Sequence, residues 1–175
     1  MPDSFWNLTN LEYIDLSGSK KLKRLPDSFG NLTNLEHIDL SQSENFERLP
    51  NSFGDLIRLK YLDLSRCNNL TISSQTFGNI SMFEYINLNY CMKIEELPPQ
   101  VAHQRHLEKL SCPFLEIVPS QLGGNLKELK LRRGHDYKEF KCFPISNEML
   151  IELTKLTVNE CVFSALPFEI DRGEP

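Results

Sequence analysis

The sequence predicts an α/β repeat solenoid with a parallel sheet on one side and irregular or short helical segments on the other. Three observations predict it: a period of 24 residues, apolar and polar alternation inside each period, and a recurring Leu-Pro step. Self-similarity at a fixed period indicates that each unit buries its apolar side against its neighbours.

The period is carried by apolar residues that return at the same position of each unit. The aromatic position recurs every 24 residues, and two leucine-type positions keep the same step. These three series are Phe5, Phe29, Phe53, Phe77; Leu8, Leu32, Leu56, Ile80; and Leu11, Leu35, Leu59, Phe83.

Each unit also contains a Leu-x-x-Leu-x-Leu segment, as in Leu35, Ile38 and Leu40. Alternation places Ile38 and Leu40 on one face of a short strand and Asp39 on the other. This matches the leucine-rich-repeat template, so we predict a leucine-rich-repeat horseshoe with a parallel concave β-sheet. Proline in the Leu25-Pro26 step ends strand pairing, and the spacing of Phe29, Leu32 and Leu35 predicts a helical turn or two on the convex side.

The later units keep the motif and lose the strict period. We predict a single domain of about seven repeats: regular 24-residue repeats over 1–96, irregular repeats over 97–165 and an incomplete repeat over 166–175. Neither end carries a recognisable polar capping unit, which solenoids need to cover terminal apolar faces. We therefore expect a segment of a longer protein.

Charge and composition exclude several function classes. A net charge of −5 argues against nucleic-acid binding, which needs a basic face. No apolar run approaches the roughly 18 residues of a membrane span. Five cysteines without paired spacing favour reduced thiols in the cytosol. Four glycosylation sequons, at Asn7, Asn31, Asn69 and Asn79, point instead to secretion, although copying of a repeat also explains them.

Several units resemble the repeats of plant intracellular nucleotide-binding leucine-rich-repeat immune receptors, known as NLR disease resistance proteins. The likeness covers residues 1 to about 110 and is carried by the segment from Leu25-Pro26 to Leu40-Ser41. Cys67 and Cys91, in a turn where many repeat families place asparagine, reinforce it. Plant extracellular receptors usually have Gly-x-Ile-Pro where this chain has Leu-Pro, which favours the cytoplasmic group.

The resemblance implies a ligand-sensing and autoinhibitory role in plant defence signalling, in the cytoplasm or the nucleus. Its implied partners are a pathogen effector or a guarded host signalling protein, together with intramolecular contact to a nucleotide-binding region. No Gly-x-x-x-x-Gly-Lys-Ser/Thr loop occurs here, so any nucleotide site must lie elsewhere. A free-standing repeat scaffold or adaptor in intracellular signalling, or an extracellular receptor ectodomain, are the alternatives.

Outward strand positions form columns along the predicted concave face, acidic and aromatic in the first four repeats and basic in the sixth. We predict that they bind protein, although the aspartates also suit solvation of the sheet or a bond to the next strand, and tyrosine is a good strand former. A further column comprises Glu12, Glu36, Lys60, Glu84, Glu108, Lys127 and Thr154. The candidate binding residues are Tyr13, Asp15, His37, Asp39, Tyr61, Asp63, Tyr85, Asn87, Lys109 and Lys130.

The segment from Arg132 to Glu148 breaks the repeat pattern and is a candidate contact loop or an insertion without a role. Its candidate contact residues are Arg132, Arg133, His135, Asp136 and Tyr137. The pair His103 and His106 lacks the glutamate of a zinc protease motif, and no nucleophile has a base beside it. We expect no catalytic residue, no metal and no cofactor, and hence no enzyme.

Overall fold

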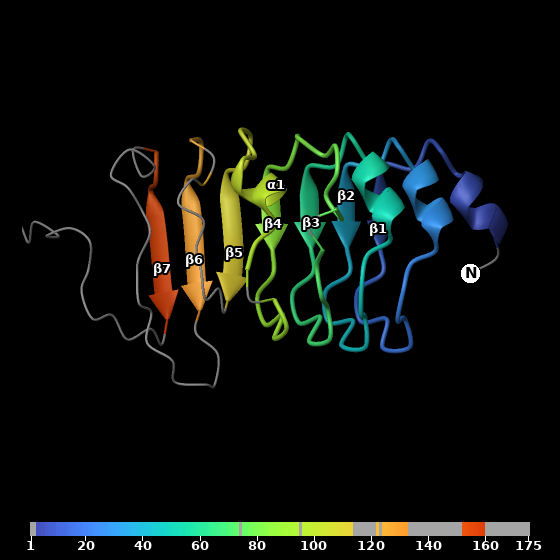
Figure 1. The fold of residues 1–175 in the computed structure, drawn as a ribbon, viewed down its shortest axis with the longest axis horizontal. Coiled ribbons are helices and arrows are strands. Elements are labelled where there is room, and N and C mark those ends of the chain that lie inside the picture. Colours follow the sequence, from blue (N-terminus) through green and yellow to red (C-terminus); the bar gives the residue numbers. More distant parts are fainter. Residues whose placement is uncertain are drawn as a thin grey trace, which may run out of the picture.

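In the computed structural model the chain forms a single row of seven parallel strands, one from each repeat (Figure 1). The structure describes residues 3–73, 75–94, 96–113, 122, 124–132 and 152–159. Each strand pairs with the next in the chain, and Tyr13, His37, Tyr61, Tyr85, Lys109, Glu128 and Lys155 stand in register. The strands are β1 Tyr13–Asp15, β2 His37–Asp39, β3 Tyr61–Asp63, β4 Tyr85–Asn87, β5 Lys109–Pro113, β6 Glu128–Arg132 and β7 Lys155–Asn159.

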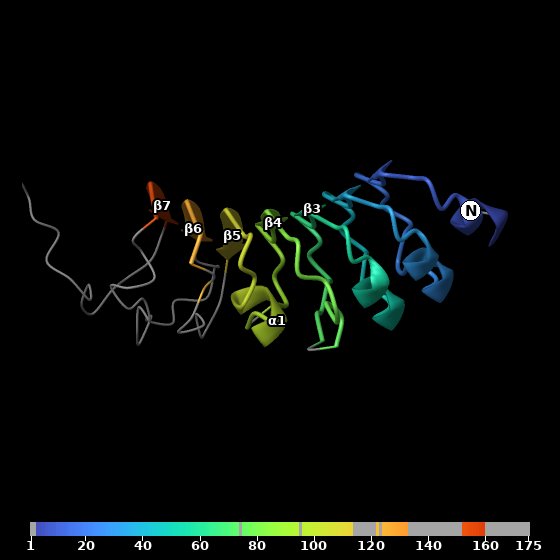
Figure 2. The same cartoon turned by 90° about the horizontal axis from the view of Figure 1, so that it is seen from above.

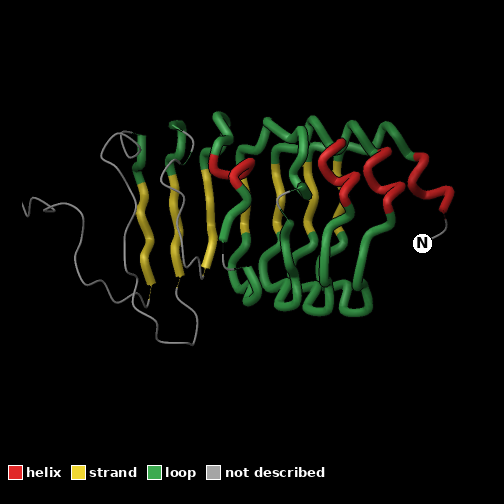
Figure 3. Tube along the Cα trace, in the orientation of Figure 1, coloured by secondary structure: helices red, strands yellow, loops and turns green. Residues whose placement is uncertain are grey.

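The opposite side of the coil is built from short helical turns and loops (Figures 2 and 3). Pro26 and Pro50 hold the extended backbone that precedes a 3-10 helix, with φ of −71° and −68°. In the fourth repeat residues 75–79 form a turn instead of a helix. The helices are η1 Asp3–Asn7, η2 Asp27–Asn31, η3 Asn51–Asp55 and α1 Pro99–Ala102. The predicted horseshoe architecture is thereby confirmed, with little helix.

The core lies between these two sides and is filled by the repeating apolar positions. Phe29, Phe53 and Phe77 are fully buried, and so are Leu35 and Ile38. A Cβ on Gly30 would collide with the carbonyl oxygen of Ser52 in the next repeat, so η2 and η3 pack closely only with glycine at that position. Each repeat therefore depends on its neighbours for burial, as expected of a solenoid.

Two sets of side chains tie consecutive repeats together by hydrogen bonds to backbone carbonyl oxygens. Asn34 and Asn45 donate from Nδ2 to the carbonyls of Thr9 and Lys20, both at 2.8 Å. Inside the core, three small side chains donate in the same way from one repeat to the one before it. These bonds are Ser43 Oγ to Leu16 at 3.2 Å, Cys67 Sγ to Leu40 at 3.2 Å and Cys91 Sγ to Leu64 at 3.0 Å.

The spacing of aromatic rings on the two opposite sides of the coil shows its curvature. On the helical side the ring centroids of Phe29 and Phe53 are 6.2 Å apart. On the strand side the rings of His37 and Tyr61, from the same two repeats, are 3.9 Å apart. Neighbouring strands are spaced about 4.8 Å apart, so side chains converge on the strand face and diverge on the other. The strand face is therefore the concave face, as Figure 2 shows from above.

Parts of the predicted organisation lie outside the described residues. Arg132 is the last residue of β6, so the strand extends to the start of the predicted loop. Arg133, His135, Asp136, Tyr137 and the incomplete repeat over 166–175 are among the residues that are not described. Among the helices that the structure does describe, none has the length and hydropathy of a membrane span.

Candidate functional site

The predicted binding residues lie on the outward positions of the strands. In β1, Tyr13 and Asp15 are exposed and the Ile14 between them is buried. The same alternation repeats in β2 and β3. The register brings all ten candidate residues into two adjacent columns, which end on Lys109 of β5 and Lys130 of β6. Whether these columns bind a protein remains a prediction.

The first of these columns is a continuous stack of rings, which we call the aromatic column: Tyr13, His37, Tyr61 and Tyr85. Successive ring centroids are 4.5, 3.9 and 4.1 Å apart, with interplanar angles of 29°, 8° and 4°. Because the rings stack in parallel, they cover one another's flat faces. Another molecule can therefore contact the ring edges and the polar atoms. Tyr13, at the end of the column, is 54% exposed.

The second column, Asp15, Asp39 and Asp63, serves the turn that follows each strand; we call it the aspartate column. The Oδ1 atom of each accepts a hydrogen bond of 2.8 Å from the backbone N–H of the serine two residues later. Asn87 repeats this bond to Asn89 at 3.1 Å and donates from Nδ2 to Asp63 Oδ2 at 2.9 Å. The aspartates thus hold their own turns, a role that was absent from the sequence interpretation, which considered protein binding, solvation of the sheet and a bond to the next strand.

These turns impose an unusual backbone conformation three residues after each aspartate and after Asn87. Gly18, Gln42, Arg66 and Tyr90 all have φ between 60° and 64°, which is the left-handed region. Only the first repeat places glycine there. Arg66 also lies over the ring of Tyr90, with Cζ 5.1 Å from the ring centroid, an inter-repeat contact that sequence reasoning missed.

The electrostatics of the aromatic column follow from its partial burial beside the aspartate column. Burial lowers the pKa of His37 below its usual value, and the carboxylates of Asp39, Asp63 and Asp15 oppose this shift. Burial also raises the pKa of Tyr61 and of Tyr85. His37, Tyr61 and Tyr85 are therefore uncharged at neutral pH, while hydrogen bonds from Ser17 lower the pKa of Asp15 and keep that carboxylate ionised.

A third set of side chains, which we call the edge column, is charged except for its last member. Each residue immediately precedes a strand in the chain, so the set runs along the edge of the sheet: Glu12, Glu36, Lys60, Glu84, Glu108, Lys127 and Thr154. Lys60 pairs with Glu36 at 2.7 Å, and Lys127 pairs with Glu108 at 2.7 Å. On the strands themselves Glu128 lies between Lys109 at 3.6 Å and Lys155 at 3.7 Å. The 24-residue period predicted the positions of these charges, but their pairing from repeat to repeat depends on side-chain geometry.

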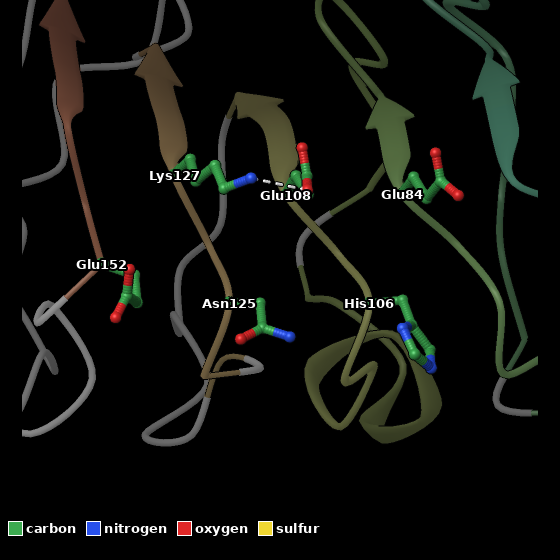
Figure 4. Close-up of a pocket in the computed structure, with 6 residues that line it drawn as sticks. All are labelled: Glu84, His106, Glu108, Asn125, Lys127 and Glu152. Carbon is green, nitrogen blue, oxygen red and sulfur yellow. Dashed lines mark hydrogen bonds and ion pairs between the residues drawn. The ribbon is translucent and has the colours of Figure 1, made fainter.

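Two shallow hollows of about 330 Å³ each lie over the second half of the sheet. One, at the sheet edge, is lined by Glu84, Glu108 and Lys127 at the strand starts and by His106, Asn125 and Glu152 (Figure 4). The other lies over β4 to β7, and we call it the cationic hollow. Its lining includes Tyr85, Asn87, Lys109, Ser111, Glu128, Lys130, Lys155 and Thr157.

The hollows are lined mainly by side chains that can make polar contacts. Within the described part of the chain no cluster of three or more His, Cys, Asp or Glu residues is placed to hold a metal ion, and His103 and His106 are both exposed. Cys67, Cys91 and Cys112 are free and buried. Burial raises the pKa of Cys67 and of Cys112 to about 12 and raises that of Cys91 as well, so these thiols are protonated and poorly nucleophilic.

Comparison with known families agrees with this geometry. Residues 21–70 match the family model described as "Leucine rich repeat". The fold is a leucine-rich-repeat horseshoe. Solenoids of this type present an extended concave surface, which repeat proteins use for binding. A comparison with curated protein sequences finds no match.

Three plant receptor structures resemble this chain at low identity. The crystal structure of PEPR1–AtPEP1 is 16% identical over 98% of this chain and 35% of that chain, with a TM-score of 0.48. The plant peptide hormone receptor RGFR1 in complex with RGF2 is 14% identical over 93% and 42%, with a TM-score of 0.39. The ectodomain of GASSHO1/SCHENGEN3 from Arabidopsis thaliana, bound to CASPARIAN STRIP INTEGRITY FACTOR 2, is 14% identical over 93% and 34%, with a TM-score of 0.24. This chain spans 34 to 42% of their lengths, and likenesses of this strength do not assign it a ligand.

Proposed function

We propose that this chain is a protein-recognition module whose concave face binds a segment of a partner protein. The observation that carries the proposal is the aromatic column, a row of four rings held rigidly by stacking on a regular sheet. Rigid aromatic side chains provide contact area with little loss of conformational entropy on binding. Charged columns on both sides of the rings supply specificity more than affinity.

The size of the face supports a protein partner over a small molecule. Seven strands spaced about 4.8 Å apart give a face roughly 29 Å long, comparable to a 20-residue helix. The hollows on it are open, polar and shallow, whereas small-molecule sites are concave and mostly apolar. An extended or helical protein segment fits this shape.

A capture experiment tests the proposal. The 175-residue chain is used to retain proteins from plant cytosol, and it is compared with a variant carrying Tyr13→Ala, Tyr61→Ala and Tyr85→Ala. A matched control replaces the exposed apolar residues Ile57, Met82 and Met92, which lie outside the strands, with Ala. We expect the control to retain a partner that the tyrosine variant loses, at unchanged circular dichroism. Equal retention by both variants would place recognition elsewhere.

Within this function we propose the ligand-sensing and autoinhibitory part of a plant intracellular immune receptor, acting in defence signalling. The support is the resemblance of the repeats and the burial of Cys67 and Cys91 as hydrogen-bond donors in the core. A free-standing intracellular scaffold is the second candidate, and an extracellular receptor ectodomain the third. The complete coding sequence decides among them: an upstream nucleotide-binding module supports the first candidate, and a signal peptide supports the third.

A further inference from the structure

The concave face is divided by charge along the axis of the solenoid. Over β1 to β4 the outward and edge positions carry six carboxylates, Glu12, Asp15, Glu36, Asp39, Asp63 and Glu84, against the single lysine Lys60. Over β5 to β7 the equivalent positions carry four lysines, Lys109, Lys127, Lys130 and Lys155, against the two glutamates Glu108 and Glu128. The sign of the charge therefore reverses between β4 and β5.

Most of the negative charge of the first half has no ion-pair partner among the residues that the structure describes. Lys60 meets Glu36 at 2.7 Å, and within the described residues no other lysine or arginine forms an ion pair with the six carboxylates. The hydrogen bonds that the aspartates accept come from neutral donors, the backbone N–H groups of the following serines and Asn87 Nδ2, so they do not compensate the negative charge. A cationic partner gains from every one of these uncompensated carboxylates.

The second half has the opposite imbalance, concentrated in the cationic hollow. Glu128 is shared between Lys109 and Lys155 at 3.6 and 3.7 Å. Lys130, which also lines the hollow, forms no ion pair with any residue that the structure describes. Ser111 and Thr157 add hydroxyl donors to the same lining. The hollow therefore suits a carboxylate side chain of a bound segment.

The two halves are separated by a distance that a short extended peptide spans. Asp39 on β2 marks the middle of the acidic half, and Lys130 on β6 faces the hollow, four strand steps away. Four steps of about 4.8 Å make roughly 19 Å. An extended chain advances about 3.3 Å per residue, so the corresponding partner residues lie about six positions apart.

We propose that the occupant of the concave face is an extended partner segment with a basic cluster over β1 to β3 and an acidic residue about six positions away, in the cationic hollow. The inference rests on the proposed recognition function and adds to it the charge pattern of the partner. The rings of Tyr13, His37 and Tyr61 lie under the basic cluster, and Tyr85 on β4 contacts the residues between the two charged groups.

Synthetic peptides test the charge pattern on the full 175-residue chain. A fluorescent probe carries a run of arginines, a Gly-Ser spacer and a pair of glutamates, with the charged groups centred about six residues apart. A second probe has the same composition with arginine and glutamate interleaved, and a third has glutamine in place of glutamate. Binding is followed by fluorescence anisotropy at low ionic strength, where such contacts are strongest.

We expect the patterned probe to bind about tenfold more tightly than the interleaved one, because only it satisfies both halves at once. Lys130→Gln should weaken the patterned probe about two- to fivefold and leave the glutamine probe unchanged. The control Lys93→Gln removes an exposed lysine from the turn after β4 and should change neither. Equal binding of the patterned and interleaved probes, or equal weakening of the patterned and glutamine probes by Lys130→Gln, overturns the inference.

Failure of this inference is distinguishable from failure of the proposed function. If the probes bind equally and the tyrosine variant still loses its protein partner in the capture experiment, the face is a recognition surface and the charge pattern is wrong. If the tyrosine variant keeps that partner, the recognition function of the face is itself wrong.

Discussion

His37 and Tyr61 stack with their ring centroids 3.9 Å apart and their planes within 8° of parallel, although they belong to repeats 24 residues apart. The contact exists because the strand register places them side by side and the curvature brings their rings closer than their backbones. Aromatic pairs of this kind contribute about 0.5 to 1.5 kcal/mol beyond the area they bury. The aromatic column therefore stabilises the register as well as forming the surface.

The position of a ring in the column predicts the cost of its removal. Tyr61 has a ring on each side, whereas Tyr13 has one neighbour and is 54% exposed. We expect Tyr61→Ala to lower the free energy of unfolding by about 2 to 3 kcal/mol and Tyr13→Ala by less than about 1 kcal/mol, measured by urea denaturation. Tyr61→Phe, which keeps the ring, is the control and should cost less than about 1 kcal/mol. Equal costs for Tyr61→Ala and Tyr13→Ala would show that stacking adds nothing.

The buried thiols give a second prediction. Cys91 Sγ donates to the carbonyl of Leu64, and Ser43 Oγ makes the equivalent bond to Leu16. Cys91→Ser should therefore cost less than about 1 kcal/mol, while Cys91→Ala, which removes the donor and leaves a small cavity, should cost about 1 to 2 kcal/mol. Urea denaturation measures both. A serine variant less stable than the alanine variant would contradict the assigned hydrogen bond.

The left-handed turn position gives a third prediction. Gln42 has φ of 60°, and the corresponding residue in the first repeat is Gly18 with φ of 63°. A residue with a side chain costs about 1 to 2 kcal/mol in this region. Glycine avoids that cost, but it loses more conformational entropy on folding, which offsets part of the gain. We expect Gln42→Gly to stabilise the chain by up to about 1 kcal/mol and Gly18→Ala to destabilise it by about 0.5 to 1 kcal/mol. A Cβ on Gly18 meets no atom within 4 Å, so only backbone strain acts there. Thermal unfolding measures both variants. Destabilisation by Gln42→Gly together with stabilisation by Gly18→Ala would rule the explanation out.

The titration of His37 gives a fourth prediction. Burial lowers its pKa in the folded state, whereas in the unfolded chain it is about 6.5. Between these two values the unfolded chain binds more protons, so the stability that His37 contributes is complete above pH 6.5 and declines as the pH falls towards the folded-state pKa. NMR of the imidazole resonances should give a His37 midpoint below the value of about 6.5 of an unperturbed histidine. Asp39→Asn should lower it further, because Asp39 opposes the shift. A His37 midpoint above about 6.5 would contradict the burial argument.

Sequence patterns predicted the architecture because each apolar position of a solenoid repeats at a fixed interval. The Leu-x-x-Leu-x-Leu segment placed all seven strands, including β6 and β7 after the strict period is lost. The same alternation placed Tyr13, His37, Tyr61 and Tyr85 in one column. Side chains on a strand alternate between its two faces, so the pattern of apolar and polar residues is enough to predict which columns face outward.

What the sequence did not reveal depends on distances between side chains. The parallel stacking of His37 on Tyr61 requires the curvature of the coil, which no single repeat specifies. The sequence does not show which neighbour Asp39 or Glu36 contacts, because the period places several candidates at equivalent positions. In the structure Asp39 bonds to its own turn, and Glu36 pairs with Lys60. The candidate contacts Arg133 to Tyr137 fall outside the described residues and stay predictions.

Photo-crosslinking from two equally exposed positions tests the concave recognition surface most directly. Tyr13 and Ile57 are both 54% exposed, and only Tyr13 lies on a strand. Each is replaced in turn by the photoreactive amino acid p-benzoylphenylalanine, and the chain is irradiated in plant cytosol. The account predicts that position 13 captures a protein partner and position 57 does not. Capture of the same partner from position 57 and none from position 13 would contradict it.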